Sequence, residues 1–266
     1  MEHLLSRWEL IRRRLKGKNI FLFLDYDGTL TPIASRPEEA VLAWKVKSIL
    51  HHLAGMPNCK LAIVSGRALS DIKAMVGLEG LYYAGNHGLE IDGPNIDFKV
   101  GDFRKKKEIL KNIREDLEKR SFGIKGAFVE DKGLTLSFHY RMVKLHDLER
   151  ARAVFEDVVR LPKAQGQIRI VEGKMVFEVR PAIDWDKGNV IAWLLDRVEF
   201  ENNNAPIGPV YIGDDMTDED AFQYLKGIGL TVGVGEGRKT RAQYLLKDPS
   251  EVFEFLKRLF VLLSES

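Results

Sequence analysis

Four short runs of apolar residues divide the chain, at 20–24, 61–64, 209–212 and 230–234. Each run is continuous rather than alternating, which is typical of strands that are buried on both faces of a parallel sheet. Apolar residues recur with helical spacing between and around these runs, over 38–53, 70–76 (with Ser70 as a candidate N-cap), 216–225 and 251–263. Strands that alternate with helices predict an open α/β sheet covered on both faces.

The middle of the chain has a different pattern. Residues 102–120 predict a charged helix, 126–140 alternate between apolar and polar positions, 145–159 predict a second helix, and 167–179 predict a hairpin that turns at 172–174. Two helices and two hairpins describe a small antiparallel sheet with helices on one face.

We therefore predict a domain inserted at 103–182 into a core made of 1–102 and 183–266. Its expected hinges lie near Pro94, Gly101 and Pro181.

Composition excludes several classes of protein. The 266 residues carry a net charge of only +2, which gives no electrostatic reason to expect a nucleic acid as partner. A single cysteine, Cys59, cannot form an internal disulfide. The apolar segment 252–263 is split by two basic residues and is too short to span a bilayer, which takes about 20 apolar residues. We expect a cytoplasmic protein that has no membrane partner.

Polar side chains follow three of the four apolar runs. Asp25 and Asp27 come after the first run, Ser65 after the second and Asp214 after the third. In open α/β sheets this carboxyl edge is where ligands bind. Carboxylates that converge there repel one another unless a cation lies between them, and oxygen ligands without His or Cys favour Mg²⁺.

A cation at this edge would attract phosphate. Ser65 and the backbone N–H groups near Gly28 and Gly66 can donate hydrogen bonds to phosphoryl oxygens, and Lys187 can complete the neutralisation of charge. Such a set suits the transfer of a phosphoryl group to a carboxylate. Asp25 would attack phosphorus, and Asp27 would protonate the leaving alcohol and then activate water.

The order DxDGT, strand-end Ser, Lys and GDxxxD resembles the haloacid dehalogenase-like (HAD) phosphatases. These motifs lie at 25–29, 65, 187 and 213–218. Further segments resemble the trehalose-6-phosphate phosphatases more closely, and they lie at 24–33, 64–67, 86–90, 129–132, 139–141, 173–181 and 213–220. The resemblance implies a HAD-like Rossmannoid α/β core with a parallel sheet, and an inserted α+β cap with an antiparallel sheet.

The resemblance also implies a role for individual residues. Asp25 resembles the nucleophile and Asp27 the acid/base, while Asp25, the carbonyl of Asp27 and Asp214 resemble the Mg²⁺ ligands, supported by Asp218. The phosphate-binding positions are Ser65, Gly66 and Lys187. The positions implied for substrate binding are Arg67, Asn86, His87, Glu130, Lys132, Arg141, Lys174 and Glu178.

The implied reaction is Mg²⁺-dependent hydrolysis of trehalose 6-phosphate, a small-molecule sugar phosphate, in trehalose biosynthesis. An alternative substrate is another glycosyl phosphate, such as sucrose phosphate or glucosylglycerol phosphate, which would change only the cap contacts. A phosphoacceptor switch of the receiver type and a phosphomutase also stay open. An acid/base two residues after the nucleophile, and the inserted domain, argue against the receiver. A trehalose-phosphate synthase is a candidate partner that the sequence leaves untested.

Overall fold

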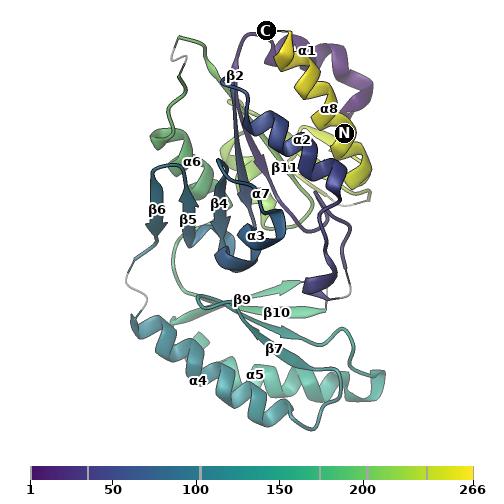
Figure 1. Cartoon of the computed structure of the whole chain (residues 1–266). Helices are drawn as coiled ribbons and strands as arrows, with labels where there is room; N and C mark the ends of the chain where they lie inside the picture. Colours follow the sequence, from purple (N-terminus) through teal and green to yellow (C-terminus); the bar gives the residue numbers. More distant parts are fainter. Residues whose placement is uncertain are drawn as a thin grey trace. The chain divides into compact units, whose positions relative to one another are not determined.

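The computed structural model describes residues 2–34, 36–101, 104–173, 175–201, 204–237 and 239–265. The chain forms two compact units, Met1–Lys99 with Trp185–Ser266, and Val100–Asp184 (Figure 1). The sequence predicts the inserted domain at 103–182, and the second unit spans Val100–Asp184. Pro94 lies in the turn between two strands of the first unit and not at the unit boundary, where the sequence had placed it.

A nine-stranded sheet forms the centre of the first unit. Its strands, in spatial order, are β1 (Glu2–His3), β13 (Tyr244–Leu246), β12 (Leu230–Val234), β11 (Ile207–Gly213), β2 (Asn19–Leu24), β3 (Cys59–Val64), β4 (Tyr82–Gly85), β5 (Glu90–Gly93) and β6 (Ile96–Lys99). The strands from β1 to β4 are parallel, and β5 and β6 add an antiparallel hairpin at one edge. The four predicted runs are β12, β11, β2 and β3, which lie side by side.

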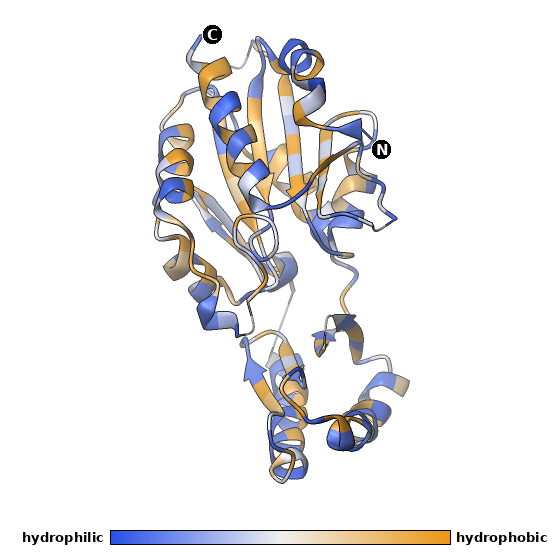
Figure 2. Ribbon diagram, turned by 90° about the vertical axis from the view of Figure 1, so that its right-hand side faces the viewer, coloured by the Kyte–Doolittle hydropathy of each residue, from blue (hydrophilic) through white to orange (hydrophobic). Residues whose placement is uncertain are grey.

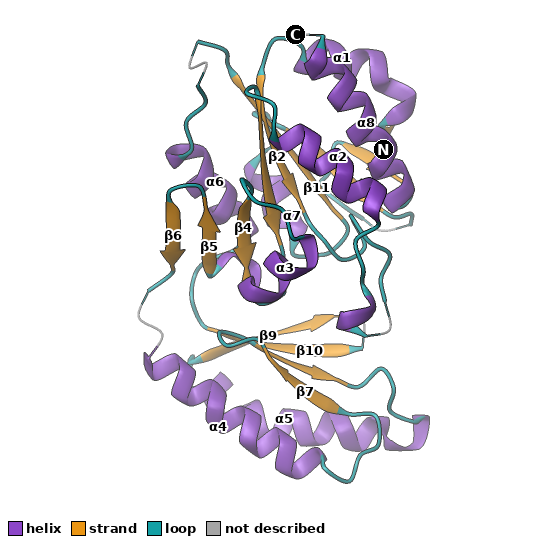
Figure 3. Cartoon of the chain, in the orientation of Figure 1, coloured by secondary structure: helices purple, strands orange, loops and turns teal. Residues whose placement is uncertain are grey.

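Helices cover both faces of this sheet, as the continuous apolar runs predicted (Figure 3). On β2, Ile20, Leu22 and Leu24 face one apolar cluster, while Phe21 and Phe23 face the other. The first cluster is covered by α1 (Trp8–Leu15), α2 (Trp44–Ala54), α3 (Leu69–Val76) and α8 (Pro249–Ser264), and the second by α6 (Lys187–Arg197) and α7 (Asp218–Tyr224). The strands of the large sheet are accordingly rich in hydrophobic residues (Figure 2).

Two of the predicted helix starts are wrong. Residues 38–53 were expected to be one helix, but α2 begins only at Trp44. Ala40 and Leu42 are buried whereas Val41 is exposed, so these positions alternate as in extended chain, and this local burial overrides the helical spacing. The helix α3 begins at Leu69 without a side-chain cap, and Ser70 lies inside it.

The second unit is a four-stranded antiparallel sheet with two helices. The strand order is β7 (Phe128–Asp131), β8 (Leu136–His139), β10 (Val176–Pro181) and β9 (Ile168–Gly173), and the helices are α4 (Arg104–Ser121) and α5 (Leu148–Ala164). Both helices pack on one face of the sheet through a single apolar cluster that includes Leu117, Phe138 and Phe155. These observations confirm the predicted class of fold for both units.

The hairpin predicted at 172–174 turns slightly later. Gly173 of β9 pairs with Val176 of β10, so the paired strands extend past the predicted turn residues Glu172 and Gly173. Lys174 lies outside the described residues, and Met175 has a left-handed φ of 65°. Across the described ranges, no helix combines the length and apolar character that crossing a membrane requires.

Candidate active site

Three carboxylates converge at the carboxyl edge of the large sheet. Asp25 directly follows β2, and Asp214 follows β11, the neighbouring parallel strand. Asp218 is the first residue of α7, four positions further on. One oxygen from each of the three carboxylates lies within 4.8 Å of the others. The motifs at residues 25 and 214–218, far apart in the chain, therefore form one acidic cluster.

Two glycines make room for this cluster. Gly28 has a φ of 82°, and a Cβ built on it would lie 2.2 Å from the Asp214 carboxylate. A Cβ on Gly213 would lie 2.3 Å from Cγ of Asp218. Any side chain at either position would collide with a carboxylate, which explains why glycine accompanies aspartate in both motifs.

Lys187 enters the cluster from the start of α6. It follows the N-cap Asp186, whose side chain accepts a hydrogen bond from the backbone N–H of Asn189 at 2.9 Å. The ammonium of Lys187 is buried and donates to Oδ1 of Asp25 at 2.8 Å and to Oδ1 of Asp218 at 2.6 Å. The capped first turn of α6 therefore holds a cation that hydrogen-bonds to two of these carboxylates.

Burial and charge act in opposite directions on these groups. Burial raises the pKa of Asp25 well above its usual range, and Lys187 lowers it only in part. Burial lowers the pKa of Lys187, but the carboxylates of Asp218 and Asp25 outweigh that effect and raise it well above its ordinary value. The lysine is therefore a permanent cation that contacts two of the three acids, and the converging carboxylate oxygens at this edge fit a divalent cation.

Ser65, Gly66 and His87 lie one strand away from the acidic cluster. Ser65 is buried at the end of β3, which neighbours β2 in the sheet. Its carbonyl accepts the backbone N–H of His87 at 2.9 Å. The His87 ring packs directly on Gly66, where a Cβ would meet it at 2.5 Å. The loops after β3 and β4 are thus joined into one substructure.

Asn86 belongs to the same substructure. Its backbone N–H donates to the carbonyl of Arg67 at 2.7 Å, and its side chain donates to Glu90 at 3.1 Å. Asn86 and His87 both have left-handed φ values, of 50° and 57°. The turn is held in this uncommon conformation by these hydrogen bonds.

Arg67 forms a two-pronged ion pair with Asp27. Its Nε donates to Oδ2 at 2.7 Å and its Nη2 to Oδ1 at 2.6 Å. The guanidinium also lies over the ring of Tyr26, 5.6 Å from the centroid. The resemblance places Arg67 with the substrate, and nothing in the sequence motifs relates positions 27 and 67, so this pair is not predictable from them.

Several residues that the resemblance assigns to substrate binding share one sheet in the second unit. Glu130 on β7 and Glu178 on β10 both pair across the sheet with Ser137 of β8, so the two glutamates lie on the same face. Lys132 lies 3.3 Å from Glu178, and the ring of His139 lies 2.7 Å from Glu130.

Two other positions in this unit, Arg141 and Lys174, are also predicted to bind substrate. Arg141 lies exposed in the turn after β8, and Lys174 lies outside the described residues. Arg180, which the sequence analysis missed, donates to Glu178 at 2.8 Å. The signal was available, since residues 178 and 180 lie two apart on a strand and therefore face the same side.

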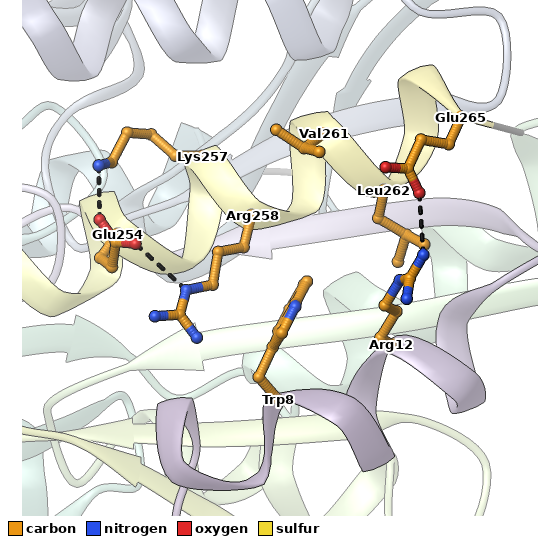
Figure 4. A pocket seen from close by; sticks show the side chains of 8 residues that line it. All are labelled: Trp8, Arg12, Glu254, Lys257, Arg258, Val261, Leu262 and Glu265. Atoms are coloured by element: carbon orange, nitrogen blue, oxygen red, sulfur yellow. Dashed lines mark hydrogen bonds and ion pairs between the residues drawn. The ribbon is translucent and has the colours of Figure 1, made fainter.

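A separate hollow lies between α1 and α8 (Figure 4). It measures about 350 Å³, and its lining is Trp8, Arg12, Glu254, Lys257, Arg258, Val261, Leu262 and Glu265. Arg12 pairs with Glu265 at 3.0 Å, and Arg258 with Glu254 at 3.1 Å. Lys257 also pairs with Glu254, so every charged group that lines the hollow is in an ion pair, and no group of the acidic cluster lines it.

A mostly parallel α/β sheet with aspartates, a serine and a buried lysine at its carboxyl edge defines a haloacid dehalogenase-like phosphohydrolase, an enzyme that cleaves phosphoric monoesters. Residues 23–250 match the family model described as trehalose-phosphatase, and the chain belongs to that family. The resemblance found in the sequence is thus confirmed.

Individual relatives agree with this assignment. "Probable trehalose-phosphate phosphatase 4" of Oryza sativa subsp. japonica is 40% identical over 261 residues, which cover 96% of this chain and 70% of the rice protein. Trehalose-phosphate phosphatase B of Arabidopsis thaliana is 38% identical, with 96% of this chain and 71% of that protein covered. Among solved structures, the C-terminal domain of C. albicans trehalose-6-phosphate phosphatase superposes with a TM-score of 0.80 at 25% identity, covering 99% of this chain and 98% of that one.

Proposed function

We propose that the protein hydrolyses trehalose 6-phosphate to trehalose and phosphate, with Asp25 as the nucleophile. The observation that carries this proposal is the contact of the buried Lys187 with Asp25 inside the acidic cluster, in a chain of the trehalose-phosphatase family. A cation next to a carboxylate orients it and offsets the repulsion that a phosphate dianion meets on approach.

The chemistry needs two transfers of the phosphoryl group. An oxygen of Asp25 attacks phosphorus, the bond from phosphorus to the sugar oxygen breaks, and Asp27 donates a proton to that oxygen. Asp27, now a carboxylate, takes a proton from water, which attacks the aspartyl-phosphate and releases phosphate and free Asp25. Lys187, Ser65 and the N–H of Gly66 would bind the phosphoryl oxygens.

We assign Mg²⁺ to the divalent cation that the family and the donor set imply. Asp25, the backbone carbonyl of Asp27 and Asp214 would hold it, and Asp218 would support them. When bound, it supplies positive charge that draws the phosphate to Asp25. Three carboxylate oxygens within 4.8 Å of one another support this assignment.

Sugar recognition is assigned to the polar face of the second unit. Glu130 and Glu178 are already held by basic partners, so their oxygens are ordered acceptors for sugar hydroxyls. Lys132, Arg141 and Lys174 would add donors on the same unit. Arg67, Asn86 and His87 complete the proposed set on the first unit.

Two further proposals concern the surroundings of the enzyme. We propose that it works in the cytoplasm, which the single buried Cys59 supports because a reducing compartment leaves such a thiol intact. We also propose a trehalose-phosphate synthase as a functional partner, which co-purification from the source cells would test.

The substrate proposal is tested by phosphate release from a panel of sugar phosphates, with and without Mg²⁺. Trehalose 6-phosphate should be the best substrate and should require the metal. Glucose 6-phosphate turned over at an equal rate would contradict the specific substrate, and preference for sucrose phosphate or glucosylglycerol phosphate would favour the alternative.

The variant Glu178→Ala locates the selectivity. Losing a charged acceptor for a sugar hydroxyl should lower kcat/KM for trehalose 6-phosphate by about 10²-fold and leave p-nitrophenyl phosphate hydrolysis nearly unchanged. Glu172→Ala is the control, since Glu172 is an exposed glutamate of the adjacent strand β9. An unchanged kcat/KM for trehalose 6-phosphate in Glu178→Ala would contradict the assigned role.

A further inference from the structure

The hydroxyl of Tyr211 is buried and contacts the acidic cluster. It lies on β11, two residues before Gly213, and its side chain is fully buried in the apolar cluster that contains Phe21, Phe23 and Phe222. The hydroxyl donates to Oδ1 of Asp218 at 2.7 Å. No motif in the sequence singled out this residue.

Packing explains the ring of Tyr211 but not its hydroxyl. The ring meets Phe222 edge to face, with centroids 5.7 Å apart. Other positions of the same cluster carry phenylalanine, which would fill this space equally well. A hydroxyl is costly to bury unless it is hydrogen-bonded, so its single recorded bond to Asp218 is the feature that distinguishes tyrosine from phenylalanine here.

Asp218 is held from three directions. Its Oδ1 accepts hydrogen bonds from Tyr211 and from Lys187, at 2.7 and 2.6 Å. Its Oδ2 accepts the backbone N–H of Asp215 at 2.7 Å. Lys187 in turn divides its hydrogen bonds between Asp218 and Asp25. A chain of three hydrogen bonds, through Asp218 and Lys187, thus connects the hydroxyl of Tyr211 to the carboxylate assigned as nucleophile.

We propose that Tyr211 is a positioning residue of the phosphoryl-transfer site, which acts through Asp218 on the placement of Lys187 beside Asp25. The proposal rests on the proposed function of Asp25 and deepens it. Tyr211 and Lys187 both donate hydrogen bonds to Oδ1 of Asp218, so the hydroxyl reduces the electrostatic attraction between Asp218 and the lysine. Without the hydroxyl, Lys187 is drawn toward Asp218 and away from Asp25 and the incoming phosphate.

The test compares Tyr211→Phe with Tyr83→Phe. Tyr83 is also buried in the first unit, and its hydroxyl donates to the backbone carbonyl of Leu78 at 2.6 Å. Each variant therefore removes one bonded, buried hydroxyl, but only one of these hydroxyls contacts the site. Cooperative thermal melting of both variants verifies their folds.

Two measurements separate positioning from simple destabilisation. Tyr211→Phe should lower kcat for trehalose 6-phosphate by about tenfold and weaken the binding of inorganic phosphate, measured by calorimetry, several-fold. Tyr83→Phe should leave both within about twofold of the wild type. Wild-type kcat and phosphate affinity in folded Tyr211→Phe would overturn the proposal.

A double-mutant cycle tests the route through Lys187. In a Lys187→Met background, Tyr211→Phe should cause no further loss of phosphate affinity, because the group on which it acts is gone. An additive loss would overturn the proposal. Asp218→Asn serves if Tyr211→Phe does not fold, since unchanged kcat and phosphate affinity in that variant would also overturn it.

Failure of the proposed function would look different. Turnover retained in Asp25→Asn would show that Asp25 is not the nucleophile. The proposed function would then fail, and with it the site that Tyr211 is proposed to position. An inactive Asp25→Asn together with a fully active Tyr211→Phe would overturn only the inference about Tyr211.

Discussion

Asp25 is both a buried carboxylate and the proposed nucleophile. Burial favours its neutral form, which cannot attack phosphorus. The ammonium of Lys187 at 2.8 Å opposes this, and a divalent cation would do so further. The charge state of this residue therefore depends on partners that come from other parts of the chain.

The roles of Asp25 and Asp27 are separable by substitution. Asp25→Asn and Asp27→Asn should each lower turnover by at least about 10²-fold, because an amide is neither a good nucleophile nor a proton shuttle. Phosphate release from trehalose 6-phosphate measures the loss.

The control for these two variants is Asp92→Asn, which removes an ion-paired carboxylate on β5, away from the acidic cluster. It should retain near wild-type activity. More than a few per cent of wild-type activity in either Asp25→Asn or Asp27→Asn would contradict the assignments.

At the scale of secondary structure, α6 connects stability with the site. Asp186 caps this helix, and the next residue is Lys187. The cap fixes the backbone from which the lysine reaches Asp25, so its loss should affect the fold and the site together. The helix α8 offers a comparison, because Asp248 caps it through the backbone N–H groups of Ser250 and Glu251, away from the acidic cluster.

Asp186→Ala and Asp248→Ala should each lower the free energy of unfolding by about 1 kcal/mol, the usual cost of losing an N-cap. Urea denaturation measures this. Only Asp186→Ala should also lower kcat/KM, because only that helix carries Lys187. Equal activity in the two variants would show that the cap of α6 does not position the lysine.

The alkaline stability of the whole molecule follows from its buried weak acids. Burial raises the pKa values of Tyr26, Tyr83 and the Cys59 thiol to about 12. In the unfolded chain these groups ionise at about pH 8.5 to 10, so the unfolded state binds fewer protons above that range. The stability they contribute is complete below it and is lost as the pH rises toward about 12.

Urea midpoints should therefore fall steadily as the pH is raised above about 9, while tyrosine absorbance shows delayed phenolate formation in the folded protein. Tyr83→Phe should make the fall less steep, because it removes one of the buried groups whose pKa is raised. A midpoint that does not change over this interval would contradict the raised pKa values.

The sequence by itself determined the centre of the large sheet. The runs at β2, β3, β11 and β12 are apolar on both faces, and only central parallel strands need that pattern. Their polar ends marked the edge at which Asp25, Asp214, Asp218 and Lys187 meet. Short strands such as β4 and β13 escaped prediction because a few residues carry too little periodicity.

Only the tertiary structure decided which side chains touch. The pairs Tyr211–Asp218 and Arg67–Asp27 depend on how the strands and loops lie in space, and no spacing rule ties position 27 to position 67. The periodicity of apolar residues along the sequence indicates whether a residue faces the core, because each residue is buried or exposed individually. A hydrogen bond requires two groups to be within about 3 Å of each other, and only the folded chain sets that distance.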